Sequence, residues 1–294
     1  MKTYLKHQNR SVLLRALFAL LLVSGLLLLL GCRTEESAAP LQIYFLDVGQ
    51  GDCALLRTAQ GDILIDAGPE SAQESLVHRL RSLGVTSLRL AIFTHPDEDH
   101  LGGADGVLEH FPAEQVWVNG SEESSETVLA FLSAVQKTGA ALRAVRAGER
   151  IRFGETELTV LAPMAGTSFE GNSGSVIVRV TCGEASALFS GDAELEAEEA
   201  LLERYGREML SAGLYKVSHH GAANGSSEAF LRAVRPQYAV ICCGAENPYG
   251  HPNGATLLRL AQAGAEIYRT DLCGDILFVT EGTEWERIEL WQRY

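Results

Sequence analysis

Basic residues are scarce in this chain of 294 residues. Lysine and arginine together number 24, against 38 aspartates and glutamates, and the formal net charge at pH 7 is −14. Broad electrostatic affinity for nucleic acid or for an anionic lipid surface needs a positive footprint. The charge balance therefore excludes a general polyanion-binding protein, and any anionic substrate must be held locally at a dedicated site.

Cysteine is present, but without the spacing of a thiolate metal site. None of the six cysteines belongs to a C-x-x-C motif, which argues against metal binding by cysteine. If Cys32 is lipidated, the other five cannot all pair, so a disulfide framework is excluded as well. Four of the cysteines are expected to be small residues inside apolar strands: Cys53, Cys182, Cys242 and Cys243.

Long hydrophobic runs are lacking, with one exception near the N-terminus. Positions 12–30 are apolar at all but three places, and three basic residues precede them. The fifteen residues 16–30 are fewer than the roughly 20 of a comfortable membrane span. They match the hydrophobic region of an export signal instead. No second run approaches this length, so the rest of the chain is expected to lie outside the membrane.

The end of the apolar run predicts how the protein is held at a membrane. Small Gly31 directly precedes Cys32, as a lipoprotein signal peptidase requires. We expect 1–31 to be a lipoprotein signal peptide and Cys32 to be lipidated. Residues 32–40 are polar and lack periodicity, which fits a tether. The predicted location is the outer side of the cell membrane, reached through an N-terminal lipid, with secretion as the alternative.

Residues 41–294 contain no internal linker and are predicted to form one domain. Short apolar runs separated by Gly-rich turns indicate antiparallel strands, and helical patterns alternate with buried strands. Strands grouped before helices, twice over, predict two packed sheets covered by helices, a four-layer αββα arrangement in the α/β class. The helices are expected at Ser71–Leu83, Ala104–His110, Ser125–Thr138, Ala193–Arg207, Glu228–Val234 and Ala255–Ala263.

The strongest chemical signal is a cluster of His and Asp residues where the strand Leu88–Thr94 ends. His95, Asp97, Asp99 and His100 fall within six positions and are followed by two glycines. In so short a loop the four side chains can turn toward one point, with Gly102 and Gly103 allowing a tight bend. A solvated loop with a capping Asp is the alternative. The alternating pattern of imidazoles and carboxylates favours metal binding.

Two further strand ends supply candidate ligands. Asp192 follows the apolar strand Ala187–Ser190, and His219 and His220 follow Leu214–Val217. Taken alone, Asp192 is more often the N-cap of a helix than a ligand. Beside the His and Asp cluster, its carboxylate could bridge two cations.

At these positions the chain resembles the metallo-β-lactamase superfamily. More narrowly, it is similar to the extracellular C-terminal domain of ComEC-type competence proteins and to their stand-alone relatives. Besides the cluster itself, the resemblance rests on the following motifs: Phe45-Leu46-Asp47-Val48-Gly49-Gln50-Gly51-Asp52, Ile65-Asp66-Ala67-Gly68, Ser190-Gly191-Asp192-Ala193-Glu194, Lys216-Val217-Ser218-His219-His220-Gly221 and Tyr249-Gly250-His251-Pro252.

The resemblance implies a metallo-β-lactamase-like αββα sandwich with a hydrolase site for two divalent metal ions. Asp192 would bridge, Asp99 and His100 would hold one metal, and His95 with Asp97 the other; one or both of His219 and His220 would contribute. The remaining candidate roles are catalysis by Asp99 and His251, and substrate binding by Lys216, Asn172 and Ser173.

The chain departs from the commonest superfamily pattern in two places. Asp97 replaces the second histidine of His-x-His-x-Asp-His, and the histidine expected before the bridging aspartate is absent from the segment Asn172–Ser175. Oxygen ligands in place of imidazole shift the expected metal from Zn²⁺ alone toward Mn²⁺. The loss of a zinc-rich first site also argues against β-lactamase activity.

The predicted function is a membrane-tethered, metal-dependent phosphodiesterase or nuclease, with a phosphodiester, DNA among the candidates, as substrate. Transport of DNA is not expected, since the chain lacks the many membrane spans of ComEC proteins. Two alternatives stay open: a phosphoesterase acting on cell-envelope polymers such as phosphorylcholine or teichoic-acid esters, and a metal- or solute-binding lipoprotein without turnover. No protein partner is predicted.

Overall fold

The computed structural model describes residues 41–166 and 171–290. They belong to a compact unit that extends from Pro40 to Tyr294. The signal, lipidation and tether predictions for residues 1–40 lie outside the described residues. Within the described ranges, no helix has both the length and the apolar character needed to cross a bilayer.

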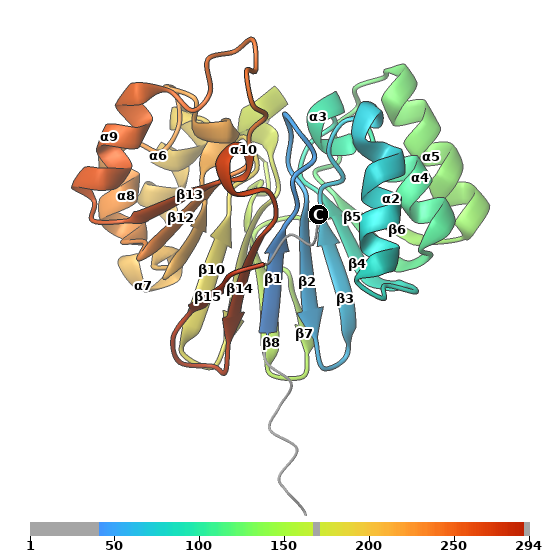
Figure 1. Cartoon of the computed structure of the whole chain (residues 1–294), viewed down its shortest axis with the longest axis horizontal. Coiled ribbons are helices and arrows are strands. Elements are labelled where there is room, and N and C mark those ends of the chain that lie inside the picture. Colours follow the sequence, from blue (N-terminus) through green and yellow to red (C-terminus); the bar gives the residue numbers. More distant parts are fainter. Residues whose placement is uncertain (1–40, 167–170, 291–294) are drawn as a thin grey trace, which may run out of the picture. The chain divides into compact units, whose positions relative to one another are not determined.

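Two sheets lie at the centre of the domain (Figure 1). The first has eight strands in the order β15-β14-β1-β2-β3-β4-β5-β6, and the second has seven in the order β13-β12-β11-β10-β9-β8-β7. The first sheet comprises β1 (Leu41–Phe45), β2 (Ala54–Thr58), β3 (Gly61–Ile65), β4 (Leu88–Phe93), β5 (Ala113–Val118), β6 (Ala141–Ala144), β14 (Ile276–Thr280) and β15 (Glu286–Ile288). The second comprises β7 (Arg150–Phe153), β8 (Thr156–Ala162), β9 (Ile177–Cys182), β10 (Ala185–Phe189), β11 (Leu214–Lys216), β12 (Tyr238–Ile241) and β13 (Glu266–Arg269).

Helices cover the outer face of each sheet (Figure 1). Over the first sheet lie η1 (Glu70–Ala72), α2 (Gln73–Ser82), α3 (Glu98–Leu101), α4 (Ala104–His110) and α5 (Glu126–Thr138). The second half of the chain supplies η2 (Gly171–Gly174), α6 (Leu195–Arg204), α7 (Arg207–Leu210), η3 (Ser218–Gly221), α8 (Glu228–Val234), α9 (Gly254–Gln262) and α10 (Thr270–Cys273). The four-layer αββα prediction is confirmed.

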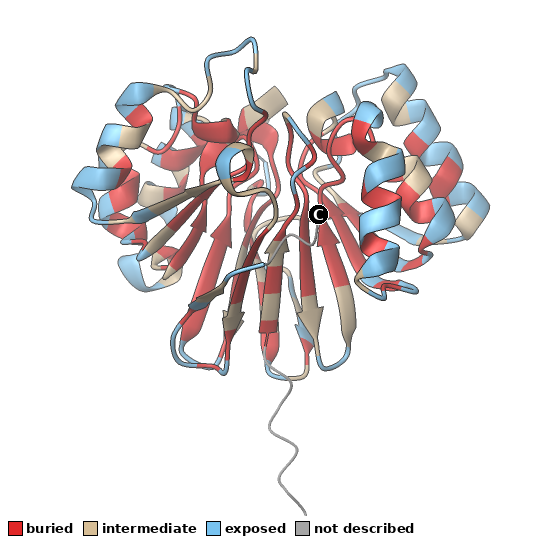
Figure 2. Ribbon diagram, viewed as in Figure 1, coloured by how far each residue is buried: buried red, intermediate tan, exposed pale blue. Residues whose placement is uncertain are grey.

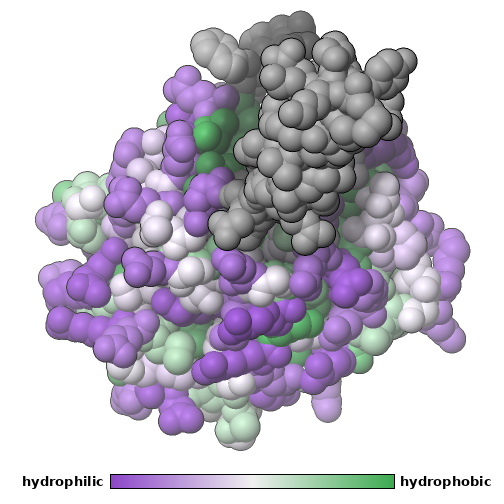
Figure 3. Space-filling model, turned by 90° about the horizontal axis from the view of Figure 1, so that it is seen from below, coloured by the Kyte–Doolittle hydropathy of each residue, from purple (hydrophilic) through white to green (hydrophobic). Residues whose placement is uncertain are grey.

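Three apolar layers hold this arrangement together. Between the sheets, aromatic side chains such as Phe45 and Phe189 stack with their ring centroids 5.8 Å apart. A second layer packs the first sheet against its helices, and a third packs the second sheet against α6, α8 and α9. Figure 2 shows the result as buried strands and half-buried helices. The face in Figure 3 is largely hydrophilic, with smaller hydrophobic areas between, outside the part drawn in grey.

Parallel pairing brings several strand ends to one edge. Strands β3 to β6 are parallel to one another, as are β10 to β13. The carboxyl ends of parallel strands are where open α/β sheets place their ligands. The segments that follow β4, β10 and β11 carry the predicted metal ligands, so the topology gathers them at this edge.

Candidate metal centre

An inner group of four side chains meets at this edge: Asp99 and His100 from α3, Asp192 after β10, and His220 from η3. The Nε2 atom of His100 lies 3.1 Å from Asp192 Oδ1 and 3.3 Å from the Nε2 atom of His220. His220 Nε2 lies 3.3 Å from Asp192 Oδ2 and 3.1 Å from Asp99 Oδ2. Ligand atoms this close suit a small divalent cation, which binds nitrogen and oxygen at about 2.0–2.2 Å.

The opposite ring nitrogens of the two histidines are held by other groups. His100 Nδ1 lies 2.9 Å from Asp66 Oδ2, and His220 Nδ1 lies 2.8 Å from the carbonyl oxygen of Cys242. A carbonyl oxygen only accepts hydrogen bonds, so Nδ1 of His220 donates and Nε2 presents its lone pair. Such partners fix the orientation and tautomer of metal-binding histidines. Both Nε2 atoms are therefore directed at Asp192.

Asp52 stands behind His220 rather than in the inner group. Asp52, His100, Asp192 and His220 are all buried, and each offers one potential ligand atom within 4.8 Å of the others. The Asp52 carboxylate, however, faces the Nδ1 side of His220, with Oδ1 at 3.2 Å. It thus positions this histidine from the side away from Asp99.

The electrostatics of the group call for a cation. Burial lowers the pKa of His100 and of His220, but the charge of Asp192 and other carboxylates outweighs burial and holds both pKa values well above the ordinary value. Burial likewise raises the pKa of Asp192, and the two histidines overcome it and keep that pKa well below its ordinary value. Without a metal, protons must balance the clustered carboxylates, and a divalent cation can replace them.

An outer group is formed by His95, Asp97 and His219. His219 Nε2 is 3.7 Å from Asp192 Oδ2, and His219 Nδ1 is 3.5 Å from Glu194 Oε1. Buried His95 places Nε2 3.6 Å from Oδ2 of the half-buried Asp97. These separations are wider than those of the inner group, so the outer group is the more open half of the centre.

Two buried atoms support metal binding in both groups. Asp192 Oδ1 and His95 Nε2 make no hydrogen bond within the described residues, and each instead faces another candidate ligand, His100 at 3.1 Å and Asp97 at 3.6 Å. Buried polar atoms are normally hydrogen-bonded, so atoms that face other ligand-type groups without a hydrogen bond point to an ion. The donor set of imidazole and carboxylate fits a divalent metal such as Zn²⁺ or Mn²⁺.

The polar residues of η2 surround the outer group. The Nδ2 atom of Asn172 donates to Glu194 Oε1 at 3.1 Å and lies 3.4 Å from His219 Nε2, while Ser173 is buried. Ser175 Oγ accepts a hydrogen bond from the backbone N–H of Asp192 at 3.2 Å and lies 3.4 Å from His95 Nδ1. Asn172 is thus placed at the rim, where a substrate can reach it.

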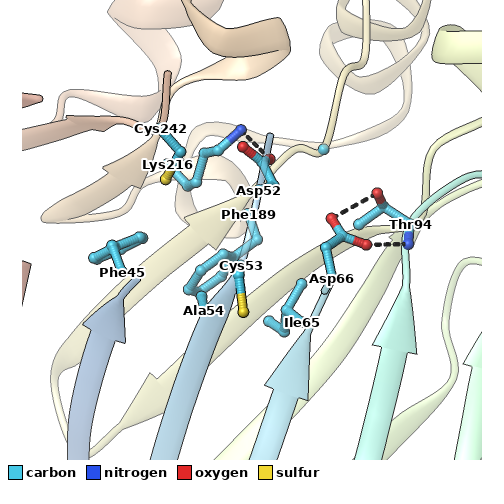
Figure 4. A pocket seen from close by; sticks show the side chains of 11 residues that line it. Phe45, Asp52, Cys53, Ala54, Ile65, Asp66, Thr94, Phe189, Lys216 and Cys242 are labelled. Atoms are coloured by element: carbon cyan, nitrogen blue, oxygen red, sulfur yellow. Dashed lines mark hydrogen bonds and ion pairs between the residues drawn. The ribbon is translucent and has the colours of Figure 1, made fainter. Parts of the chain in front are cut away.

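Lys216 requires a correction to its predicted role. Its side chain is buried and forms an ion pair with Asp52 (Figure 4). Burial lowers the pKa of Lys216, but the Asp52 charge outweighs it and raises this pKa; the pKa of Asp52 falls to about 2. An ammonium held beneath the histidines has no exposed charge for a substrate. Lys216 instead balances the carboxylate that positions His220.

A small cavity of about 10 Å³ lies beside this ion pair, and Asp66, Thr94 and Cys242 are among its lining residues (Figure 4). That volume corresponds to roughly one water molecule. Asp66 accepts hydrogen bonds from the backbone N–H of Thr94 at 2.7 Å and from its hydroxyl at 2.8 Å. The cavity therefore lies where this polar network meets the apolar core, since Phe45, Ile65 and Phe189 also line it.

His251 lies over the open side of the centre, in the loop between β12 and α9. Its ring centroid is 5.5 Å from that of His219, 6.2 Å from that of His220 and 5.7 Å from that of Tyr249. Its Nδ1 atom is buried and makes no hydrogen bond within the described residues. Burial, reinforced by His220 and His219, lowers the pKa of His251. The ring is placed to meet a ligand of the centre.

The backbone of η3 is strained where it presents these ligands. His219 and His220 have φ values of 47° and 49°, followed by Gly221 at 81°. Consecutive left-handed conformations are costly for residues other than glycine and cluster at functional sites. The conformation aims His220 inward and His219 outward, an assignment that the sequence left open.

Glu194 and Ser175 also belong to the site, although the sequence did not predict it. Both lie in segments that carry predicted site residues. Their roles depend on contacts between separate strand ends, and neither carries a local signal of its own. Asp52 and Asp66 lie behind the two inner histidines and hold them in position through their Nδ1 atoms. Asp192 does not cap α6, whose N-cap is Glu194, so its carboxylate is available to the centre.

The comparisons define the class of the protein. A family model described as the metallo-beta-lactamase superfamily matches residues 46–245, and the chain belongs to that superfamily. Among solved structures, the metallo-beta-lactamase fold protein YhfI from Bacillus subtilis has a TM-score of 0.53 and 11% identity, covering 82% of this chain and 99% of its own. At this identity, the likeness concerns the fold alone.

Curated relatives narrow the resemblance to competence proteins of the ComEC type, as the motifs predicted. Competence protein ComA of Neisseria gonorrhoeae is 30% identical over 280 residues, which cover 94% of this chain and 38% of ComA. ComE operon protein 3 of Bacillus subtilis is 28% identical over 277 residues, which cover 87% of this chain and 34% of that protein. The chain thus spans little more than a third of the length of these relatives.

Proposed function

We propose that the protein is a metal-dependent phosphodiesterase. The carrying observation is the buried Asp192 carboxylate: its Oδ1 atom faces His100 at 3.1 Å, and its Oδ2 atom faces both His220 at 3.3 Å and His219 at 3.7 Å. A carboxylate shared between two sets of ligands is the arrangement of a two-metal site, and such sites serve phosphoester cleavage. Superfamily membership supports hydrolysis as the class of reaction.

The cleft above the centre supports a dependence on metal. It has a volume of about 710 Å³, and its lining includes Asp97, Glu98, Asp99, Glu123 and Tyr249. Four carboxylates at the mouth of a site repel a phosphodiester anion. Bound divalent ions would reverse the sign of that field at Asp97 and Asp99, and would supply Lewis-acid stabilisation of phosphoryl oxygens and a lowered pKa of water.

The protein's own side chains then have distinct tasks. Asp99, His100, Asp192 and His220 would hold the inner cation, and His95, Asp97 and His219 would hold the outer one. Asp66 and Asp52 keep the two inner histidines in position. His251, over the open side, offers a ring nitrogen that can hydrogen-bond a phosphate oxygen or pass a proton to the leaving oxygen.

Cellular location and substrate are part of the same proposal. We propose an exported protein anchored through lipid on Cys32, and a phosphodiester substrate, with DNA as one candidate because the relatives are named competence proteins. The esters of cell-envelope polymers are the second candidate, and the net charge of −14 favours them over a long duplex.

The test is hydrolysis of bis(p-nitrophenyl) phosphate after removal and return of metal. We expect activity to be lost on chelation and to return better with Mn²⁺ than with Zn²⁺, since Asp97 and the missing histidine make the ligands richer in oxygen. Asp192→Asn should lower turnover at least a hundredfold and lose at least one metal per chain by elemental analysis. The exposed His78 on α2 provides the control His78→Gln, which should keep both.

Two outcomes would contradict the proposal. Metal bound tightly without turnover of any diester would favour a binding protein. Wild-type turnover in Asp192→Asn would exclude a carboxylate shared by two metals.

A further inference from the structure

An apolar cavity borders the centre on the side of β4. Its volume is about 540 Å³, and it lies between α5, the ends of β5 and β6, and the segment 119–124. Its apolar lining includes Phe93, Leu101, Val118, Val128, Leu132 and Leu142. Cavities of this size and character are typical of small-molecule sites.

Three exposed leucines line this cavity. Leu129 is 60% exposed, Leu132 41% and Leu142 40%, and all three line it. Two lie one turn apart on α5, and the third comes from β6. Single exposed leucines need no explanation, but several around one cavity form an apolar patch. Such a patch is stabilised when a ligand or a partner covers it.

The cavity adjoins the polar cleft over the metal ligands. Pro96 and Glu123 line both spaces, and His95, a predicted ligand, lines the apolar one. A molecule with its phosphodiester over Asp97 and Asp99 can therefore extend one substituent past Pro96 into the cavity.

The residues that line the cavity determine which kind of chemical group it can accommodate. Exposed Glu122 and Glu123 stand at the rim, so a second anionic group or a polyanion is disfavoured. A nucleobase would leave ring nitrogens and carbonyl oxygens without partners along Phe93, Leu132 and Val128, which is costly. The uncharged polar side chains of the lining, Asn119, Ser121 and Ser124, lie along the segment 119–124, and Asn119 is already hydrogen-bonded to Gly174 and to Ser121. A hydrocarbon chain meets neither penalty and gains by burial.

We infer that this cavity binds an alkyl or acyl chain attached to the phosphodiester on which the centre acts. The substrate class is then a lipid-type phosphodiester with one anionic group and an apolar substituent. This inference rests on the proposed phosphodiesterase activity, and it separates that activity from action on DNA.

The experiment compares two diesters with the same leaving group, methyl p-nitrophenyl phosphate and octyl p-nitrophenyl phosphate. Both are used below the critical micelle concentration of the octyl ester, with the full chain loaded with Mn²⁺. We expect kcat/KM to be at least tenfold higher for the octyl ester. In the variant Leu129→Gln/Leu132→Gln, the ratio of the two kcat/KM values should fall below threefold.

Leu258→Gln is the matched control. Leu258 is 59% exposed on α9, nearly the exposure of Leu129, and does not line the cavity. This variant should keep the wild-type ratio. The sedimentation mass of each protein is measured as well, because a second copy of the chain is the competing occupant.

The outcomes separate the two proposals. Hydrolysis of neither ester would overturn the phosphodiesterase proposal itself. Equal kcat/KM for both esters, or an octyl preference that survives the double substitution, would overturn the lipid-type substrate alone. A wild-type dimer that the double substitution dissociates would assign the cavity to self-association and overturn the inference.

Discussion

At the residue scale, the centre is a balance of buried charges built in two levels. Asp99 and Asp192 face the Nε2 atoms of the histidines, while Asp66 and Asp52 face their Nδ1 atoms. Lys216 pairs with Asp52 at the lower level. The lower level is independent of a bound cation, so its contribution can be measured as stability of the metal-free protein.

Replacing Lys216 should expose the cost of an unpaired buried carboxylate. We expect Lys216→Met to lower the free energy of unfolding of the chelated protein by about 3 kcal/mol, because removing one partner of a buried ion pair strands the other. Chemical denaturation measures this. In the double variant Lys216→Met/Asp52→Asn, the loss in free energy of unfolding should be smaller than the sum of the losses in the two single variants, by at least about 1 kcal/mol. Strict additivity would mean that the pair does not interact.

The candidate metal ligands could be predicted from the sequence because each follows a predicted strand, and strand ends on one edge of a sheet lie close together. The pairing of Lys216 with Asp52 could not be predicted, since a lysine at the end of β11 could equally well be exposed to solvent. Its burial follows from packing against the segment between β1 and β2, a contact over more than 160 residues that no local pattern records.

At the element scale, elements with local sequence signals were predicted correctly, whereas elements that depend on long-range pairing were not. Helices α4 and α8 have the predicted bounds, and Ser125 caps α5 by accepting from Val128 N–H. The predicted helix Ala193–Arg207 was too long, because the chain leaves α6 at Tyr205 and begins α7 after Gly206. Strand β15 was missed, since three residues give no periodicity and depend on pairing with β14.

The left-handed turn of η3 gives a test of strain at a functional element. A Cβ on Gly221 would lie 2.6 Å from Pro252 Cβ, next to His251, whereas a Cβ on Gly84 would meet nothing within 4 Å at nearly the same φ. We expect Gly84→Ala to cost about 1 kcal/mol for its backbone conformation alone, and Gly221→Ala about 2–3 kcal/mol. Thermal or chemical unfolding measures both.

Activity should distinguish the same two variants. Gly221→Ala should also lower kcat for bis(p-nitrophenyl) phosphate, because Pro252 must move and His251 moves with it, while Gly84→Ala keeps the wild-type rate. Equal stability losses with equal kcat would show that this contact does not hold the loop in place.

At the scale of the whole molecule, the acidic surface and the predicted lipid have opposite effects at a membrane. A net charge of −14 is repelled by anionic headgroups, so the folded domain supplies no general electrostatic attraction. Attachment must then come from the N-terminal segment. A single acyl chain anchors only marginally, whereas the diacylglyceryl group of a lipoprotein brings more than one chain.

We therefore expect Cys32→Ser to block processing or to move the protein from the membrane fraction to the soluble fraction. Fractionation with immunodetection follows the location, and mass spectrometry of the N-terminus follows the lipid. Cys273→Ser is the control, since Cys273 is a free, half-buried cysteine of α10 and should leave both unchanged. A Cys32→Ser protein that is cleaved after residue 31 and partitions with membranes as before would contradict lipidation.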